Sequence, residues 1–215
     1  MSNDYWKDMD QDPDAIARIK KSCELLDAKE GMFVLDIGCH KQEAAQYLNP
    51  NCKYLGIDTE KLHPNTYQVN IDGGFSFSEK AERILCLEVL EHLECPGGTL
   101  QTIHSLLKDD GIAVVSLPNE ATLFHRLRAL FGIVDQECFS FGGKHLHLPS
   151  LRQSRQFLEA QFEIVQEDYY ESKHAIGCKQ QWVKPLLKLI PLRILSRLIP
   201  SLFARGFIFK LKKLS

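Results

Sequence analysis

The decapeptide MFVLDIGCHK, residues Met32 to Lys41, begins as an apolar run and breaks at a glycine into polar residues. Phe33 to Leu35 have the character of a buried strand, because strands covered on both faces are continuously apolar. Asp36 and Gly38 follow directly, as they do where a strand ends in a tight turn. Such a turn before a helix is the usual cradle of a nucleotide-like ligand. We therefore expect the first strand of an α/β sheet here, with a ligand site at its carboxyl end.

The rest of the chain alternates short apolar runs with segments of helical periodicity. Further strands are expected at 53–58, 67–71, 83–87, 112–117 and 162–169, with 175–178 pairing to the last of these. Helices are expected at 13–28, 42–48, 99–107, 121–131 and 150–160. Strands that alternate with helices predict a Rossmann-like, doubly wound and mostly parallel sheet with flanking helices.

Composition indicates a globular protein with one full core, since 44% of the 215 residues are apolar and 25% are charged. The seven cysteines form no CxxC motif, which is typical of reduced thiols in a cytoplasmic protein. The first residues are acidic and lack an apolar stretch, so we expect no secretory signal.

Charge is distributed unevenly along the chain. Residues 1–171 contain 16 basic and 28 acidic residues, a net charge of −12, whereas residues 172–215 contain ten basic residues and no acidic one. Leucines and isoleucines alternate with these basic residues, but no run reaches the roughly 20 uncharged residues of a membrane span. Residues 182–213 are therefore expected to lie on an anionic membrane surface, at its inner face. The alternatives are a helical pair that covers the domain and a nucleic-acid surface, which the acidic core disfavours.

Four segments carry a family resemblance: VLDIGC (34–39), YLGID (54–58), ILCLEVLEHL (84–93) and LLKDDGIAVVSLPN (106–119). Because these segments occur in this order and at this spacing, the chain resembles the class I S-adenosylmethionine-dependent methyltransferases of the type 11/23-like group. The resemblance extends from about residue 30 to 170. The resemblance implies a seven-stranded sheet and S-adenosyl-L-methionine as the cofactor.

The resemblance also implies cofactor roles for residues at the strand ends. Asp58 would hold the ribose hydroxyls, Asp72 would meet the adenine amino group, and Asp36 would lie near the amino group of the methionine part. The full set is Asp36, Gly38, Cys39, His40, Asp58, Asp72, Leu87 and Glu88.

The glycine loop departs from the family pattern. Where the family usually reads Gly-x-Gly-x-Gly, this chain has Gly38, His40 and Gln42. A histidine at positive φ is strained, and its ring occupies space that a glycine leaves open. This degenerate loop leaves a second interpretation, a catalytically silent methyltransferase-like protein that binds a partner protein.

Glu88, Glu91 and His92 follow the fourth expected strand at helical spacing. His92 and Glu91, joined by His145 or His147 from the long loop, are the candidate catalytic residues, with a slight preference for His145. The motif is similar to Glu-x-x-Glu-His in metal-dependent O-methyltransferases, where an ion orients the accepting hydroxyls. A divalent metal held by Glu88, Glu91 and His92 is thus a candidate, although a structural role for the motif is favoured over it.

The expected organisation is an N-terminal helix (1–30) packed on a methyltransferase domain (31–180) and followed by a basic amphipathic segment (181–215). Residues 118–150 are expected to form a substrate loop or lid, because long loops at such sites are usually functional. The expected activity is methyl transfer, at oxygen, to a small-molecule or a lipid- or glycan-linked acceptor. The alternatives are the silent binding protein and a metal-assisted RNA 3′-end methyltransferase.

Overall fold

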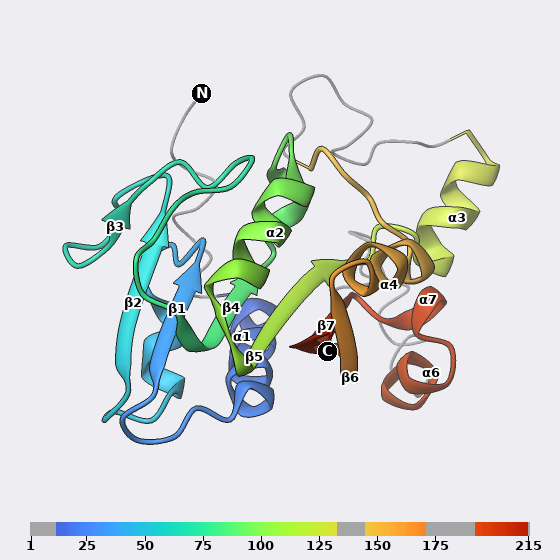
Figure 1. Ribbon diagram of the computed structural model, residues 1–215. Coiled ribbons are helices and arrows are strands. Elements are labelled where there is room, and N and C mark those ends of the chain that lie inside the picture. The colour runs from blue at the N-terminus through green and yellow to red at the C-terminus, as the bar shows by residue number, and fades with distance from the viewer. Residues whose placement is uncertain (1–11, 133–144, 171–191, 215) are drawn as a thin grey trace.

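A seven-stranded mixed sheet forms the centre of the computed structural model, which describes residues 12–132, 145–170 and 192–214. The strands lie in the order β3-β2-β1-β4-β5-β7-β6 (Figure 1). The strands from β3 to β5 are parallel to one another, and β7 runs antiparallel to both β5 and β6. The expected α/β fold with a mostly parallel sheet is confirmed.

Strands and helices alternate along most of the described chain. The strands are β1 (Phe33–Ile37), β2 (Lys53–Asp58), β3 (Tyr67–Gln68), β4 (Ala81–Leu87), β5 (Leu107–Pro118), β6 (Phe162–Tyr170) and β7 (Gly206–Lys213). The helices are α1 (Pro13–Leu26), α2 (Pro96–Leu106), α3 (Leu123–Leu130), α4 (Leu151–Glu159), α6 (Leu192–Leu198) and α7 (Pro200–Phe203), with 3₁₀ helices η2 (Glu43–Tyr47) and η3 (Leu90–His92).

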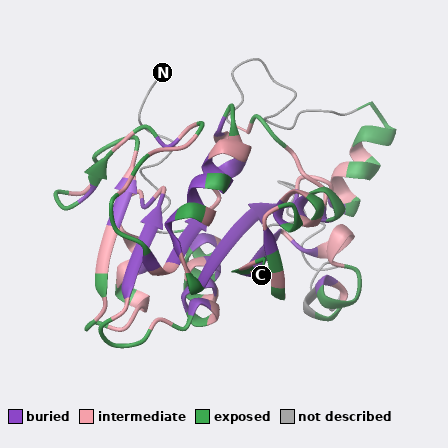
Figure 2. Ribbon diagram, in the orientation of Figure 1, coloured by how far each residue is buried: buried purple, intermediate pink, exposed green. Residues whose placement is uncertain are grey.

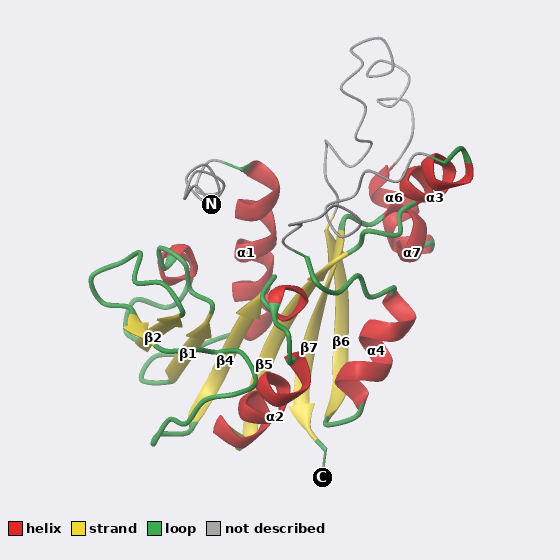
Figure 3. Cartoon of the chain, turned by 90° about the horizontal axis from the view of Figure 1, so that it is seen from above, coloured by secondary structure: helices red, strands yellow, loops and turns green. Residues whose placement is uncertain are grey.

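Two apolar layers sandwich the sheet, with α1 on one face and α2 and α4 on the other (Figure 3). Val34 of β1 belongs to the layer that contains Leu26 of α1, whereas the next residue, Leu35, belongs to the layer of Ile103 in α2. All five residues of β1 are buried, as the apolar run at 33–37 predicts for a strand covered on both faces (Figure 2).

Helix α1 begins after Asp12, whose side chain accepts a hydrogen bond from the backbone N–H of Asp14. Its buried face is not purely apolar. Ile16 is 36% exposed, whereas Arg18 is 8% exposed and faces the sheet. The helix therefore brings a buried cation, and not only apolar side chains, to the domain.

Several element bounds differ from the sequence prediction. Helix α2 begins at Pro96 instead of Thr99, since a proline fits the first helical turn. Strand β5 already begins at Leu107 instead of residue 112. Strand β3 is limited to two residues.

The principal correction concerns the basic tail. Residues 206–213 form β7, a strand between β5 and β6, so the predicted domain boundary at residue 180 does not separate the tail from the sheet. Phe207, Phe209 and Leu211 are fully buried in it, which an amphipathic segment on a membrane would not allow. The expected strand at 175–178 lies outside the described residues, and β6 pairs with β7 instead.

The other predicted segments are helical in part where the structure describes them. The expected loop 118–150 contributes α3, while residues 133–144 lie outside the described part of the chain. Residues 192–203 of the tail contribute α6 and α7. None of the helices among the described residues is long and apolar enough to cross a membrane.

Candidate active site

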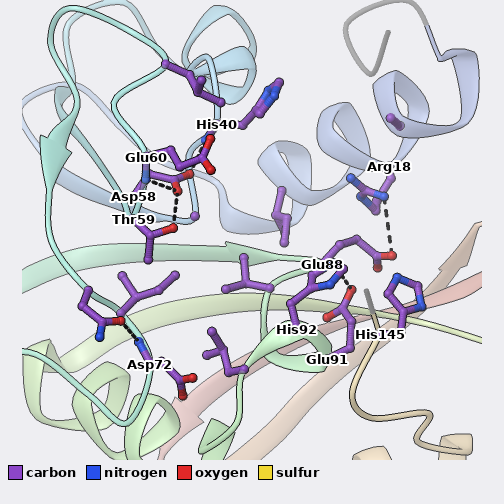
Figure 4. Close-up of a pocket in the computed structure, with 18 of the residues that line it drawn as sticks. Arg18, His40, Asp58, Thr59, Glu60, Asp72, Glu88, Glu91, His92 and His145 are labelled. Carbon is purple, nitrogen blue, oxygen red and sulfur yellow. Dashed lines mark hydrogen bonds and ion pairs between the residues drawn. The ribbon is translucent and has the colours of Figure 1, made fainter. Parts of the chain in front are cut away.

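A cavity of about 510 Å³ runs along the carboxyl-terminal edge of β1, β2 and β4 (Figure 4). Asp58 and Glu60 line one end of it, and Glu91, His92 and His145 line the other. Its apolar walls are Leu62, Ile71, Leu87, Val89 and Leu93. Open α/β sheets bind their ligands at this edge, which is where the opening decapeptide predicts a site.

The loop after β1 keeps a left-handed backbone without the additional glycines of the family pattern. Gly38, His40 and Gln42 have φ values of 74°, 47° and 65°. The His40 N–H donates to Asp58 Oδ2 at 2.8 Å, and Nδ1 of its ring lies 2.6 Å from Oε1 of Glu43. Figure 4 shows the ring turned away from Glu88 and Glu91. These contacts hold the strained histidine and direct its ring toward η2.

Gly38 itself is required by close packing. A Cβ atom at this position would lie 2.3 Å from Cγ2 of Val89, on the loop after β4. The backbone N–H of Gly38 and that of Cys39 both donate to the carbonyl of Ile57, which joins the loop to β2. The ends of three strands are thereby drawn together around the cavity.

Asp58 ends β2 and lines the cavity, as expected. Its Oδ2 accepts from His40 N, and its Oδ1 accepts from the Glu60 N–H and the Thr59 hydroxyl, each at 3.2 Å. With about two lone-pair sites on each carboxylate oxygen, Oδ2 keeps one acceptor site and can still accept a hydrogen bond from a ribose hydroxyl. Glu60, which the sequence analysis missed, lies beside it.

Asp72 lines the cavity but is engaged by the backbone. Its Oδ1 and Oδ2 accept from the N–H groups of Cys95 and Glu94, both at 2.9 Å, and these hydrogen bonds lower the pKa of the carboxyl. Its own N–H donates to Asn70 Oδ1 at 3.0 Å. Asn70 and Ile71 line the cavity beside Asp72, so three neighbouring residues occupy the wall where Asp72 alone was expected.

Asp36 and Cys39 lie behind the loop and line a smaller cavity of about 50 Å³. Oδ2 of Asp36 accepts from the Tyr54 hydroxyl at 2.6 Å, and burial raises the pKa of this carboxyl to about 7 despite that hydrogen bond. Cys39 is 4% exposed, and burial raises the pKa of its thiol to about 12. Neither side chain lines the main cavity.

Glu88 turns toward α1 and β6. Its Oε1 accepts from the hydroxyls of Ser116 and Tyr170, both at 3.2 Å, and its Oε2 lies 3.7 Å from Nη1 of Arg18. The guanidinium of Arg18 also lies 5.9 Å from the ring centroid of Tyr170. Glu88 is thus engaged by Arg18, Ser116 and Tyr170, and it does not belong to the group of ligand atoms formed by Glu91, His92 and His145.

Glu91, His92 and His145 come together at the end of the cavity. Ligand atoms from the three lie within 4.8 Å of one another, and the two imidazole centroids are 4.8 Å apart. Glu91 is 1% exposed, and both of its oxygens lack a hydrogen-bond partner among the described residues. Burial, with a contribution from Glu88, raises the pKa of this carboxyl well above its ordinary value. His147 points elsewhere, with Nε2 2.9 Å from the carbonyl of Leu93, so of the two loop histidines it is His145 that lines this cavity.

Two further residues border this end of the cavity. Arg205, between α7 and β7, lines the cavity, and its Nη1 lies 3.2 Å from Glu120. Glu120 also lies 3.7 Å from Nδ1 of His145 and 4.0 Å from Nδ1 of His125 in α3. Sequence patterns gave no indication of this network, because its members come from three distant segments.

The residues around the cavity fit S-adenosylmethionine. Asp58 can accept a ribose hydroxyl, Leu62 and Ile71 provide apolar walls for a flat base, and Gly38 permits close approach to the backbone. Glu91, His92 and His145 line the opposite end of the same cavity, which is where a second reactant would approach the cofactor.

The comparisons agree with this geometry. Residues 5–167 match the family model described as methyltransferase domain. With the fold and the cavity, this match defines a class I S-adenosylmethionine-dependent methyltransferase. The chain belongs to the methyltransferase-domain family, and the expectations of this enzyme class and this cofactor are confirmed.

Solved structures with the same fold cover nearly the whole chain. The N-methyltransferase NodS from Bradyrhizobium japonicum WM9, in complex with S-adenosyl-L-homocysteine, has a TM-score of 0.62 at 16% identity and covers 100% of this chain and 94% of NodS. Coclaurine N-methyltransferase bound to N-methylheliamine has a TM-score of 0.60 at 16% identity, with 99% and 79% covered. A methyltransferase from Archaeoglobus fulgidus has a TM-score of 0.60 at 16% identity, with 92% of each chain covered. At these identities the likeness shows the fold alone. None of the curated protein sequences matches the chain.

Proposed function

We propose that the enzyme methylates a hydroxyl oxygen of a small-molecule or lipid-linked acceptor. The observation that carries this proposal is the cluster of Glu91, His92 and His145 at the end of the cavity opposite Asp58. An amine acceptor is nucleophilic without help once it is neutral, whereas a hydroxyl gains from a base. Imidazoles beside the cavity therefore favour oxygen as the methylated atom.

In the proposed reaction His92 accepts the hydroxyl proton. S-adenosylmethionine supplies an activated methyl group, so the protein itself needs no nucleophile. The acceptor oxygen forms the new bond to the methyl carbon as the carbon–sulfur bond breaks, and the proton moves to the imidazole. Glu91 Oε1 lies 3.8 Å from Nε2 of His92 and, when ionised, stabilises the resulting imidazolium. His145 completes the acceptor wall.

A methylation assay with an isotope-labelled methyl group tests this assignment. His92→Gln is expected to lower kcat by about a hundredfold or more while the affinity for S-adenosylhomocysteine stays unchanged. The matched control is His104→Gln in α2, a histidine that packs against Phe162 outside the cavity. NMR of the labelled product distinguishes an oxygen-bound methyl group from a nitrogen-bound one, and a nitrogen-bound group would refute the hydroxyl acceptor.

A second candidate is a metal-assisted version of the same reaction. Glu91, His92 and His145 offer one carboxylate and two imidazoles whose ligand atoms lie within 4.8 Å of one another, and the carboxylate of Glu91 accepts no hydrogen bond from the described residues. A divalent ion held by these residues would orient the acceptor hydroxyl and lower its pKa. Calorimetric titration of Mn²⁺ or Zn²⁺ into the protein tests this directly. Binding that Glu91→Gln abolishes supports the ion, whereas full activity in the presence of a chelator excludes it.

A further inference from the structure

Helices α3, α6 and α7 form one surface beyond the β6 and β7 end of the sheet. Helix α7 contacts both α3 and α6, and the three lie together in Figures 1 and 3. Large apolar side chains are exposed on this surface, and we call them the helical patch: Leu123, Leu127, Leu130, Phe131, Ile194, Leu198 and Ile199. Leu130, Phe131 and Leu198 are 77%, 78% and 71% exposed.

The apolar side chains of α3 do not belong to the apolar core of the domain. None of its residues is buried, and Figure 2 shows most of the helix as exposed. Leu123, Leu127 and Leu130 are spaced by four and three residues, which places them on one face. An exposed apolar face of this kind marks an interaction site.

The two segments that carry the helical patch contain basic residues but no acidic one. Neither residues 121–132 nor residues 192–205 contain an aspartate or a glutamate. Arg126 and Arg197 are exposed and form no ion pair with any carboxylate in the described part of the chain. Apolar side chains interleaved with arginines are typical of helices that lie in the interface of an anionic bilayer. A second copy of the chain would instead place arginines against arginines.

The helical patch lies beside the acceptor end of the cavity. His125 of α3 is 4.0 Å from Glu120, and Arg205, two residues after α7, is 3.2 Å from the same carboxylate. Arg205 also lines the cavity. A lipid surface in contact with the helical patch would therefore adjoin the space for the acceptor.

We propose that the helical patch docks the enzyme on an anionic lipid bilayer through apolar insertion of α3 and α6 and through contacts of Arg126 and Arg197 with lipid headgroups. Docking needs neither cofactor nor acceptor. The additional consequence, that the acceptor comes from the bilayer, rests on the proposed function.

Co-sedimentation of the full chain with lipid vesicles tests the docking. Binding is expected for phosphatidylcholine vesicles that contain about 30% phosphatidylglycerol, and weak binding for phosphatidylcholine alone. The double variant Leu130→Ser/Phe131→Ser is expected to lower the partition coefficient about tenfold or more, because the most exposed apolar side chains are lost. Arg126→Gln/Arg197→Gln is expected to lower it by a similar factor on anionic vesicles only, and added salt should reproduce that loss.

Matched controls lie outside the helical patch. Leu214→Ser, after β7, removes a side chain that is 52% exposed, and Arg152→Gln removes an exposed arginine from α4. Both controls should sediment like the wild-type protein, and calorimetry with S-adenosylhomocysteine should give unchanged affinity for every variant.

Three results would overturn the docking proposal. The first is a full chain that stays in the supernatant with anionic vesicles, and the second is binding that neither double variant weakens. The third is a dimer in solution that Leu130→Ser/Phe131→Ser dissociates, since a second copy would then be the occupant. Because the vesicle assay requires no turnover, failure of the proposed methylation leaves its outcome unaffected.

Discussion

Arg18 in the N-terminal helix lies 3.7 Å from Glu88 at the end of β4, and the side chains of both residues are largely buried. The hydroxyl of Tyr170, at the end of β6, donates to the same glutamate. Three segments that are far apart in the sequence therefore meet at one carboxylate beside the cavity. Helix α1 is consequently part of the site and not merely a cover for the sheet.

Removal of the cation should destabilise the protein. Arg18→Met leaves Glu88 buried without its countercharge, and the loss of one partner of a buried pair costs about 3 kcal/mol. Chemical denaturation would measure the change in the free energy of unfolding. Lys20→Met, at an exposed position of the same helix, should change it by less than about 0.5 kcal/mol. Equal effects of the two substitutions would show that the ion pair contributes nothing specific.

Gly38 and Val89 should behave as a coupled pair. Gly38→Ala introduces a Cβ that would lie 2.3 Å from Val89 and places an alanine in the left-handed backbone conformation. The two effects together should lower the free energy of unfolding by about 3 kcal/mol. Adding Val89→Ala removes the clash, so the double variant should be more stable than the sum of the single changes by about 1 kcal/mol or more. Gly97→Ala, where a Cβ meets nothing within 4 Å, should simply add to Val89→Ala. Additivity at Gly38 would contradict the packing argument.

Asp58 should dominate the affinity for the cofactor. Asp58→Ala removes a charged acceptor of hydrogen bonds. We expect calorimetry to show a free energy of binding for S-adenosylhomocysteine that is weaker by about 1.5–3 kcal/mol. Asp58→Asn keeps one acceptor oxygen for the His40 N–H and should lose less. Glu79→Gln, outside the cavity, provides the control and should bind like the wild-type protein. Unchanged binding by Asp58→Ala would place the ribose elsewhere.

Asp36 should make stability depend on pH. Its folded carboxyl has a pKa of about 7, raised by burial, against roughly 3.9 when unfolded. Between these values the folded carboxyl keeps a proton that the unfolded one releases. The free energy of unfolding therefore falls as pH rises through this window, with a slope that approaches 1.4 kcal/mol per pH unit, and the loss is complete above about pH 7.

Asp36→Asn should remove this dependence and become more stable relative to the wild-type protein as pH rises from about 4 to 7. Denaturation at a series of pH values would show the difference. Asp110→Asn, at an exposed position of β5, should give a curve parallel to that of the wild-type protein. A constant difference between Asp36→Asn and wild type would contradict the raised pKa.

The parallel half of the sheet could be predicted because its central strands are buried on both faces. The apolar run at 33–37 and the acid at the end of 53–58 therefore identify β1, β2 and the edge that holds the site. Strand β7 could not be recognised in the same way. Toward the end of β7 the buried Phe209 and Leu211 alternate with Lys210 and Lys212, which are less buried. The same interleaving of apolar and basic residues fits a basic amphipathic helix, so the sequence did not distinguish the two.

The site was predictable where it depends on strand ends, and not where distant segments meet. Asp58, Leu87 and the cluster of Glu91 and His92 lie at the cavity as expected. Arg18 carries a weak signal, since it shares a helical face with Cys23 and Leu26 at spacings where apolar residues are usual. Arg205 carries none, because only the position of β7 brings it to the cavity.

The place of β7 between β5 and β6 also has a consequence for synthesis of the chain. In the described sheet β6 pairs only with β7, so it has no partner strand when it leaves the ribosome. The parallel strands can assemble early, whereas β6 can pair only after residues 206–213 have been translated and have emerged from the ribosome. A nascent chain stalled before residue 206 would expose the edge of β5 that β7 later covers. We expect chaperones to bind such a stalled chain more strongly than a chain in which β7 has emerged.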